Sequence, residues 1–115
     1  MPELQETSDL PCDTGSSLEV LEREFRDKPV DFSLVHDSWN SNEGKFLPHA
    51  PAVEKRAEEV RQWLKARPEK EIVIVTHGGF LHYFTEDWSD SSRFEGQLRV
   101  FHWVFSQVGK FLTDV

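Results

Sequence analysis

The sequence predicts an α/β fold built around a helix, a buried strand and a second helix in direct succession. The first helix is expected over residues 51–67, the strand over 72–75 and the second helix over 80–84. The strand reads Ile-Val-Ile-Val, and consecutive β-branched residues between charges and glycines are typical of a strand buried on both faces. This order of elements predicts an αβα segment.

Ahead of this segment, the chain is expected to hold one short helix between two irregular stretches. Residues 7–15 are rich in turn formers and are predicted to form a loop. Ser16 and Glu19 fit a capping box, which predicts a helix that Pro29 ends, with an apolar face formed by Leu18, Leu21 and Phe25. Residues 31–50 show no sustained period and predict a long loop, either a functional one or an ordinary surface excursion.

The helix expected over 51–67 has an apolar stripe and a charged face. Pro51 suits the first helical position, and Pro68 closes the element. Spacings of four, three and four residues place on one stripe Val53, Ala57, Val60 and Leu64. The charged face is expected to meet solvent and carries Glu54, Glu58, Glu59, Arg61 and Lys65.

The charge balance excludes two classes of partner. The chain has 115 residues and a formal net charge of −8, from 21 acidic and 13 basic residues. Such a surface repels nucleic acids and acidic membranes, whose binding depends on Lys and Arg. We therefore expect neither as a partner, and the oligomeric state stays open.

Cys12 is the only cysteine, so no internal disulfide can form. The carboxylate of Asp13 beside it disfavours a reactive thiolate, and we expect a structural thiol. No apolar run approaches the roughly 20 residues that span a bilayer, and the N-terminal sequence lacks the features of a secretory signal. These observations predict a soluble cytoplasmic protein.

The most informative motif places a histidine where the predicted strand ends and a helix begins, in Thr76-His77-Gly78-Gly79-Phe80. In open α/β sheets, ligands bind beyond the carboxyl ends of the strands. A helix N-terminus offers amide donors and a partial positive charge, which suit a phosphate. Gly78 and Gly79 let the backbone approach such a ligand closely. His77 is therefore a candidate donor to a bound oxyanion, with Gly78 beside it.

Together with this motif, several segments resemble the fungal branch of the histidine phosphatase superfamily, which is phosphoglycerate-mutase-like. They are residues 4–6 (Leu-Gln-Glu), residues 8–15 (Ser-Asp-Leu-Pro-Cys-Asp-Thr-Gly), Asp31-Phe32, Trp39 and residues 76–81 (Thr-His-Gly-Gly-Phe-Leu). The resemblance covers residues 3 to about 96 and is strongest over 69–88. It implies a three-layer αβα fold and phosphoryl hydrolysis or transfer on a small phosphorylated metabolite, with no cofactor and no metal.

The resemblance also implies a role for two residues. In this family, the histidine of an Arg-His-Gly motif on the first strand takes the phosphoryl group, a second histidine helps to hold it, and a glutamate protonates the leaving oxygen. By their place in the motifs, His77 resembles the second histidine and Glu6 the general acid. Such a site works chiefly by positioning and by electrostatic stabilisation of the transferring group.

The sequence departs from the family pattern at both ends. No Arg-His-Gly triplet occurs in the 115 residues, so neither the nucleophile nor the first strand is found. From residue 97 an apolar tail replaces the expected polar stretch, and its period fits neither a helix nor a strand. We therefore expect residues 1–96 to form the C-terminal portion of an N-terminally truncated, incomplete domain, followed by a divergent tail over 97–115. Such a chain is expected to be inactive and poorly stable by itself.

Three other functions can be compared with the phosphatase-like one. A non-catalytic module that binds phosphate or a protein partner would use the same strand-end pocket, and the sequence leaves this alternative open. A metal site is disfavoured, because His77 and His82 lie five residues apart rather than the four that put two ligands on one helix face. Serine-hydrolase chemistry is disfavoured, since no Gly-x-Ser-x-Gly motif occurs.

Overall fold

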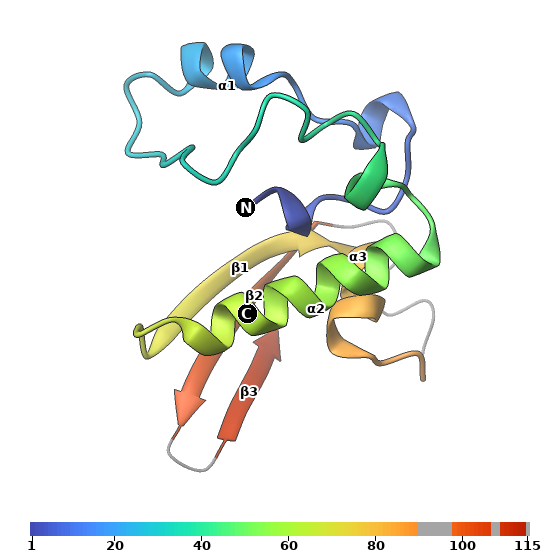
Figure 1. The fold of residues 1–115 in the computed structure, drawn as a ribbon. Coiled ribbons are helices and arrows are strands. Elements are labelled where there is room, and N and C mark those ends of the chain that lie inside the picture. The colour runs from blue at the N-terminus through green and yellow to red at the C-terminus, as the bar shows by residue number, and fades with distance from the viewer. Residues whose placement is uncertain (90–97, 107–108, 115) are drawn as a thin grey trace.

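The structure is a computed structural model that describes residues 1–89, 98–106 and 109–114. Its helices are α1 (Leu18–Glu24), α2 (Ala50–Ala66) and α3 (Gly78–Thr85), and its strands are β1 (Glu71–His77), β2 (Leu98–Ser106) and β3 (Gly109–Asp114). Short 3₁₀ turns form at η1 (Pro2–Leu4), η2 (Pro11–Asp13) and η3 (Gly44–Phe46). The α/β class predicted from the sequence is confirmed (Figure 1).

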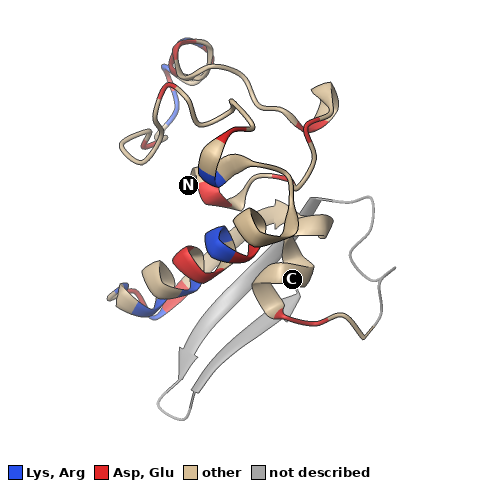
Figure 2. Ribbon diagram, turned by 45° about the vertical axis from the view of Figure 1, so that its right-hand side comes forward, with Lys and Arg blue, Asp and Glu red and all other residues tan. Residues whose placement is uncertain are grey.

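The helix α2 begins and ends within one residue of the predicted bounds. All four residues of its predicted apolar stripe are buried, and they form one core cluster with Ile74, Phe80, Leu81 and Phe84. This core lies between α2, α3 and one face of β1 (Figure 1). Figure 2 shows acidic and basic residues along α2 and uncharged residues throughout α3. No helix in the described part of the chain is long and apolar enough to cross a membrane.

The strand β1 is buried on one face only, so the predicted burial of both faces is wrong. Ile74 and Thr76 are 4% and 1% exposed, whereas Val73 and Val75 are 61% and 49% exposed. Successive side chains point to opposite faces of a strand, and α2 and α3 pack on the face of Ile74. Among the described residues, no helix covers the face of Val73. A three-layer arrangement therefore stays a prediction.

The apolar tail, whose period predicted neither a helix nor a strand, forms two strands, and one of them pairs with β1. β2 pairs antiparallel with β1, with Ile74 opposite Phe101, and β3 pairs antiparallel with β2. The sheet order is β1-β2-β3, so one edge of β1 forms a ladder of hydrogen bonds with β2. The domain boundary expected at residue 96 falls among residues 90–97, outside the described part, and stays a prediction.

The predicted short helix forms as α1, but its cap is Ser17 and not Ser16. The Ser17 hydroxyl accepts a hydrogen bond from the Val20 amide at 3.4 Å, which caps the first turn from one residue later than predicted. The proposed capping box of Ser16 with Glu19 is therefore wrong. The long loop predicted after this helix is confirmed, since turns and η3 lead from it to α2.

Hydrogen bonds from Trp39 and Asn40 connect this long loop to the loop around Gly15. Nε1 of Trp39 donates to the carbonyl of Ser16 at 3.1 Å, and Nδ2 of Asn40 donates to the carbonyl of Gly15 at 2.8 Å. The indole ring lies where a Cβ on Gly15 would be. Nε2 of Gln5 donates to the Trp39 carbonyl at 2.9 Å, so both loops are also tied to the N-terminal segment.

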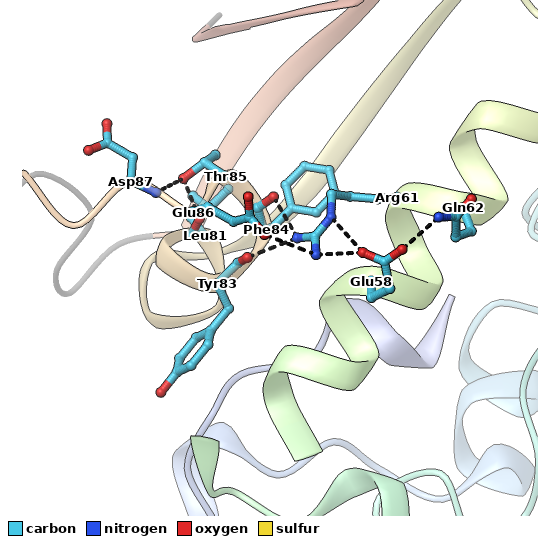
Figure 3. Close-up of polar contacts among 9 residues, drawn as sticks. All are labelled: Glu58, Arg61, Gln62, Leu81, Tyr83, Phe84, Thr85, Glu86 and Asp87. Carbon is cyan, nitrogen blue, oxygen red and sulfur yellow. Dashed lines mark hydrogen bonds and ion pairs between the residues drawn. The ribbon is translucent and has the colours of Figure 1, made fainter. Parts of the chain in front are cut away.

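Arg61 fixes the C-terminal end of α3, although its place on the charged face of α2 predicted a side chain in solvent. Its Nη1 donates to the carbonyls of Tyr83 at 3.0 Å and of Phe84 at 3.2 Å (Figure 3). Carbonyls in the last turn of a helix have no partner within that helix. Glu58 accepts from Nη2 of the same guanidinium at 2.8 Å. The prediction that Arg61 faces solvent is wrong, because its guanidinium donates hydrogen bonds to carbonyls at the end of α3.

Candidate functional site

His77 lies at the junction of β1 and α3, as predicted. Its backbone is extended, with φ −105° and ψ 153°, and α3 begins directly after it. Gly78 and Gly79 form the first turn of this helix instead of a separate turn before it. The imidazole is 38% exposed, so an anion can reach it from solvent next to the helix N-terminus.

Glu6 lies beside His77, although the two residues are far apart in the sequence. Oε2 of Glu6 is 3.7 Å from Nδ1 of His77, an ion-pair distance when the imidazole is protonated. Oε1 of the same carboxylate accepts hydrogen bonds from the amide of Thr7 at 2.8 Å and from its hydroxyl at 3.2 Å. One carboxylate oxygen is therefore held by Thr7, while the other faces the imidazole.

The missing side chain of Gly79 makes room for this carboxylate. A Cβ at Gly79 would lie 2.6 Å from Oε1 of Glu6 and 2.7 Å from Oγ1 of Thr7. From the sequence, Gly78 and Gly79 were expected to let a ligand come close to the backbone. At Gly79, the group that approaches the backbone is the side chain of Glu6.

Two buried side chains hold the segment that carries Glu6, and the sequence analysis missed both. The Thr76 hydroxyl donates to the carbonyl of Leu4 at 2.6 Å. The Arg56 guanidinium, which is 1% exposed, donates to the carbonyls of Glu3 at 2.8 Å, Gln5 at 3.0 Å and Glu6 at 3.3 Å. Burial lowers the pKa of Arg56 to about 10, so the guanidinium remains charged at neutral pH.

A signal for Arg56 was present in the sequence. Arg56 lies three residues after Val53 and four before Val60, so it belongs to the apolar stripe of α2 and not to its charged face. A charged residue in such a stripe is buried only when other groups satisfy it. Nothing in the local pattern identifies those groups, because they are backbone carbonyls from the first turn of the chain.

A pocket of about 300 Å³ opens beside His77. It is lined by His77 and Val75 of β1 and by loop residues that include Leu4, Gln5, Asp13 and Trp39. Cys12 also lines it and is exposed, so this thiol takes no part in the core. Among the described residues, no three His, Cys, Asp or Glu side chains come together as a metal site. The His77 imidazole lines this pocket and carries a ring N–H that can donate a hydrogen bond to an anion.

The sequence is similar to those of known proteins. Residues 1–102 match the family model described as "Histidine phosphatase superfamily (branch 1)". The chain belongs to this superfamily. The chain is 35% identical over 77 residues to "Phosphoglycerate mutase-like protein 1" of Arabidopsis thaliana, and the match covers 64% of this chain and 26% of that protein.

A second Arabidopsis thaliana protein, "Phosphoglycerate mutase-like protein", is 35% identical over 78 residues, or 64% of this chain and 27% of that protein. The chain thus spans about a quarter of the length of the curated relatives it matches. No solved structure shows significant similarity to it. The superfamily predicted from the sequence is confirmed, while the fungal branch, the truncation and the cytoplasmic location stay predictions.

The structure brings together the two residues that the sequence predicts to be catalytic, Glu6 and His77. Glu6 and His77 share one site, and Gly78 follows His77 at the start of α3. The roles of Glu6 as general acid and of His77 and Gly78 as phosphate-binding groups stay predictions.

Proposed function

We propose that this chain supplies the acid-bearing and phosphate-holding part of a phosphoryl-transfer site that acts on a small phosphorylated metabolite. Membership of the histidine phosphatase superfamily supports the reaction class. The observation that carries the proposal is the approach of Glu6 to His77, with 3.7 Å between Oε2 and Nδ1. This pairing brings the carboxyl group of Glu6 next to an imidazole at the N-terminus of α3.

Each group has a definite task in this proposal. The imidazole of His77 donates to an oxygen of the transferring phosphoryl group, and the amides of the first turn of α3, beginning at Gly78, add positive potential. Glu6, held through one oxygen by Thr7, gives its proton to the leaving oxygen. The group that accepts the phosphoryl is not among the 115 residues, since they contain no Arg-His-Gly triplet. Turnover is therefore expected only when a segment with that motif completes the site.

The fold supports the same view of an incomplete site. Val73 and Val75 expose an apolar face of β1 that a second helical layer would cover in a three-layer domain. In the sheet order of the described strands, β1 lies at an edge, where a further strand can pair with it. We therefore expect the completed domain to have a three-layer αβα fold.

A phosphatase assay tests the proposal directly. The 115-residue chain is assayed beside a version extended at its N-terminus by a segment that carries an Arg-His-Gly strand, with p-nitrophenyl phosphate as substrate. We expect hydrolysis by the extended version and none by the chain itself. Glu6→Gln and His77→Ala in the extended version should each lower kcat by about 10²-fold or more, as loss of a general acid or of an oxyanion donor does. Hydrolysis that survives both substitutions would refute the assignment.

A non-catalytic phosphate-binding module is the second candidate. The observation that favours it is the absence of the Arg-His-Gly triplet from a sequence that keeps the His77 site. In this case inorganic phosphate should raise the thermal unfolding temperature of the chain, and the extended version should stay inactive. The two assays together separate the candidates, because only the first function gains turnover on extension.

A further inference from the structure

Arg56 is a buried charged residue that donates hydrogen bonds to the backbone of one short segment. It points from α2 into the core, where its guanidinium is 1% exposed, and it forms no ion pair among the described residues. Its acceptors among the described residues are the carbonyls of Glu3, Gln5 and Glu6, which lie on the segment that carries the proposed acid. Nε has no partner there, and this incomplete satisfaction adds to the cost of burial.

A stability role alone is a poor explanation for this arrangement. A buried charge is often replaced by a well-packed apolar side chain with no loss of stability, and here the neighbours on α2 are Val53 and Ala57. What an apolar side chain cannot do is fix the direction of three carbonyls at once. A guanidinium can, because its N–H groups form a rigid planar fork.

The same guanidinium also contacts the helix that follows His77. Its Cζ lies 5.3 Å from the centre of the Phe80 ring, at the start of α3. Arg56 therefore touches both parts of the site: the segment of Glu6 through hydrogen bonds, and α3 through a cation–π contact. His77, which is 3.7 Å from Glu6, is the residue directly before α3.

We infer that Arg56 is a positioning residue that holds the carboxylate of Glu6 against His77. The inference rests on the proposed function, since it assigns a purpose to that pairing. Small errors in the placement of a catalytic group, of about 1 Å, lower rates by up to about 10²-fold, so a dedicated anchor is useful for the proposed acid. Arg56 itself touches neither substrate nor reacting atoms.

The test is a double-mutant cycle between Arg56 and Glu6, read out through inorganic phosphate. Glu6→Gln removes a negative charge beside the phosphate site, so at about pH 8 it should tighten phosphate binding by about three- to tenfold. In the Arg56→Met background the carboxylate is no longer held at His77, and Glu6→Gln should change Kd by less than about twofold. Arg56→Lys keeps a donor to the carbonyls and should restore part of the Glu6 effect.

Arg61→Met is the matched control. Arg61 also leaves α2 to bind backbone carbonyls of another element, but it holds the far end of α3 and not the acid segment. A general loosening of the fold affects both arginine variants, whereas a positioning effect is confined to Arg56. In the Arg61→Met background, Glu6→Gln should keep its full effect on Kd.

A second measurement needs no phosphate. Glu6→Gln should shift the ring-proton NMR signals of His77 in the folded chain, and this shift should vanish in the Arg56→Met background. If phosphate fails to bind but this coupling is found, the proposed function falls and the positioning role of Arg56 stands. If Glu6→Gln has the same effect with and without Arg56, the positioning role is refuted. Loss of folding in both Arg56→Met and Arg56→Lys would also refute it, since Arg56 would then be structural.

Discussion

The carboxylate of Glu6 lies over the Cα of Gly79, in the space that any other side chain at this position would fill. The N-terminal segment and the start of α3 can come together at this point because one of the two residues has no side chain.

Gly79→Ala should therefore disturb the site more than the fold. Alanine in a helix is favoured over glycine by about 1 kcal/mol, which offsets part of the collision with the flexible end of Glu6. We expect a change of less than about 1 kcal/mol in the free energy of unfolding, with a clear shift of the His77 ring signals in NMR spectra. In a Glu6→Ala background, only the Thr7 hydroxyl remains close to the new methyl group. There Gly79→Ala should be more favourable for stability than in the wild-type chain, by up to about 1 kcal/mol. A loss of several kcal/mol in that background would contradict the relationship.

Gly15→Ala should release Trp39. The indole ring is rigid and occupies the position of the new methyl group, so the ring must move and its hydrogen bond to the Ser16 carbonyl is lost. We expect a loss of about 1–3 kcal/mol in the free energy of unfolding, measured by urea denaturation. Trp39→Ala should abolish most of the further effect of Gly15→Ala. Additive losses would show that the two residues are independent.

Arg61→Met should loosen the end of α3. The carbonyls of Tyr83 and Phe84 would lose a charged donor, and hydrogen bonds to charged groups contribute about 1.5–3 kcal/mol. We expect a loss of about 1–2 kcal/mol in the free energy of unfolding, with faster amide exchange in the last turn of α3. Glu54→Gln, on the same charged face, serves as the control and should change stability by less than about 0.5 kcal/mol.

Stability should fall with acid partly through Glu58. Its hydrogen bond from Gln62, and then the one from Arg61, hold the pKa of its carboxyl below the usual 4.5 (Figure 3). Because the unfolded chain binds this proton more readily, the contribution of Glu58 is fully present above pH 4.5 and is lost as the pH falls through the lower folded value. Glu58→Gln should flatten the fall in unfolding temperature over this range. If the unfolding temperature of Glu58→Gln falls with pH as steeply as that of the wild-type chain, the hydrogen bonds to Glu58 do not contribute to acid sensitivity.

The two faces of β1 should respond differently to substitution. Ile74 is buried in the core, so Ile74→Ala is expected to lower the free energy of unfolding by about 2–4 kcal/mol. Val73 is 61% exposed, and Val73→Thr should change it by less than about 0.5 kcal/mol in the 115-residue chain. Equal losses at the two positions, measured by urea denaturation, would show that both faces are covered.

The sequence by itself determined the elements that depend on local pattern. Val53, Ala57, Val60 and Leu64 recur at helical spacing, and α2 forms with all four in the core. The run ending at Thr76 and His77 predicted a strand that passes into a helix, and β1 and α3 meet at that residue. The motifs around Glu6 and His77 also sufficed to predict the superfamily. A motif is defined by residue types and their order in the sequence, so it can be found without a structure.

Only the tertiary structure decided which groups meet. The run Ile-Val-Ile-Val predicts a strand, but its pattern cannot tell that α2 and α3 cover Ile74 and leave Val73 exposed, since both faces are equally apolar in sequence. The acceptors of Arg56 are carbonyls, which every residue carries, so no residue type marks them. The contact of Glu6 with His77 depends on that anchoring and on the space at Gly79. Sequence patterns record which side chains are present, whereas packing fixes the distances at which they act.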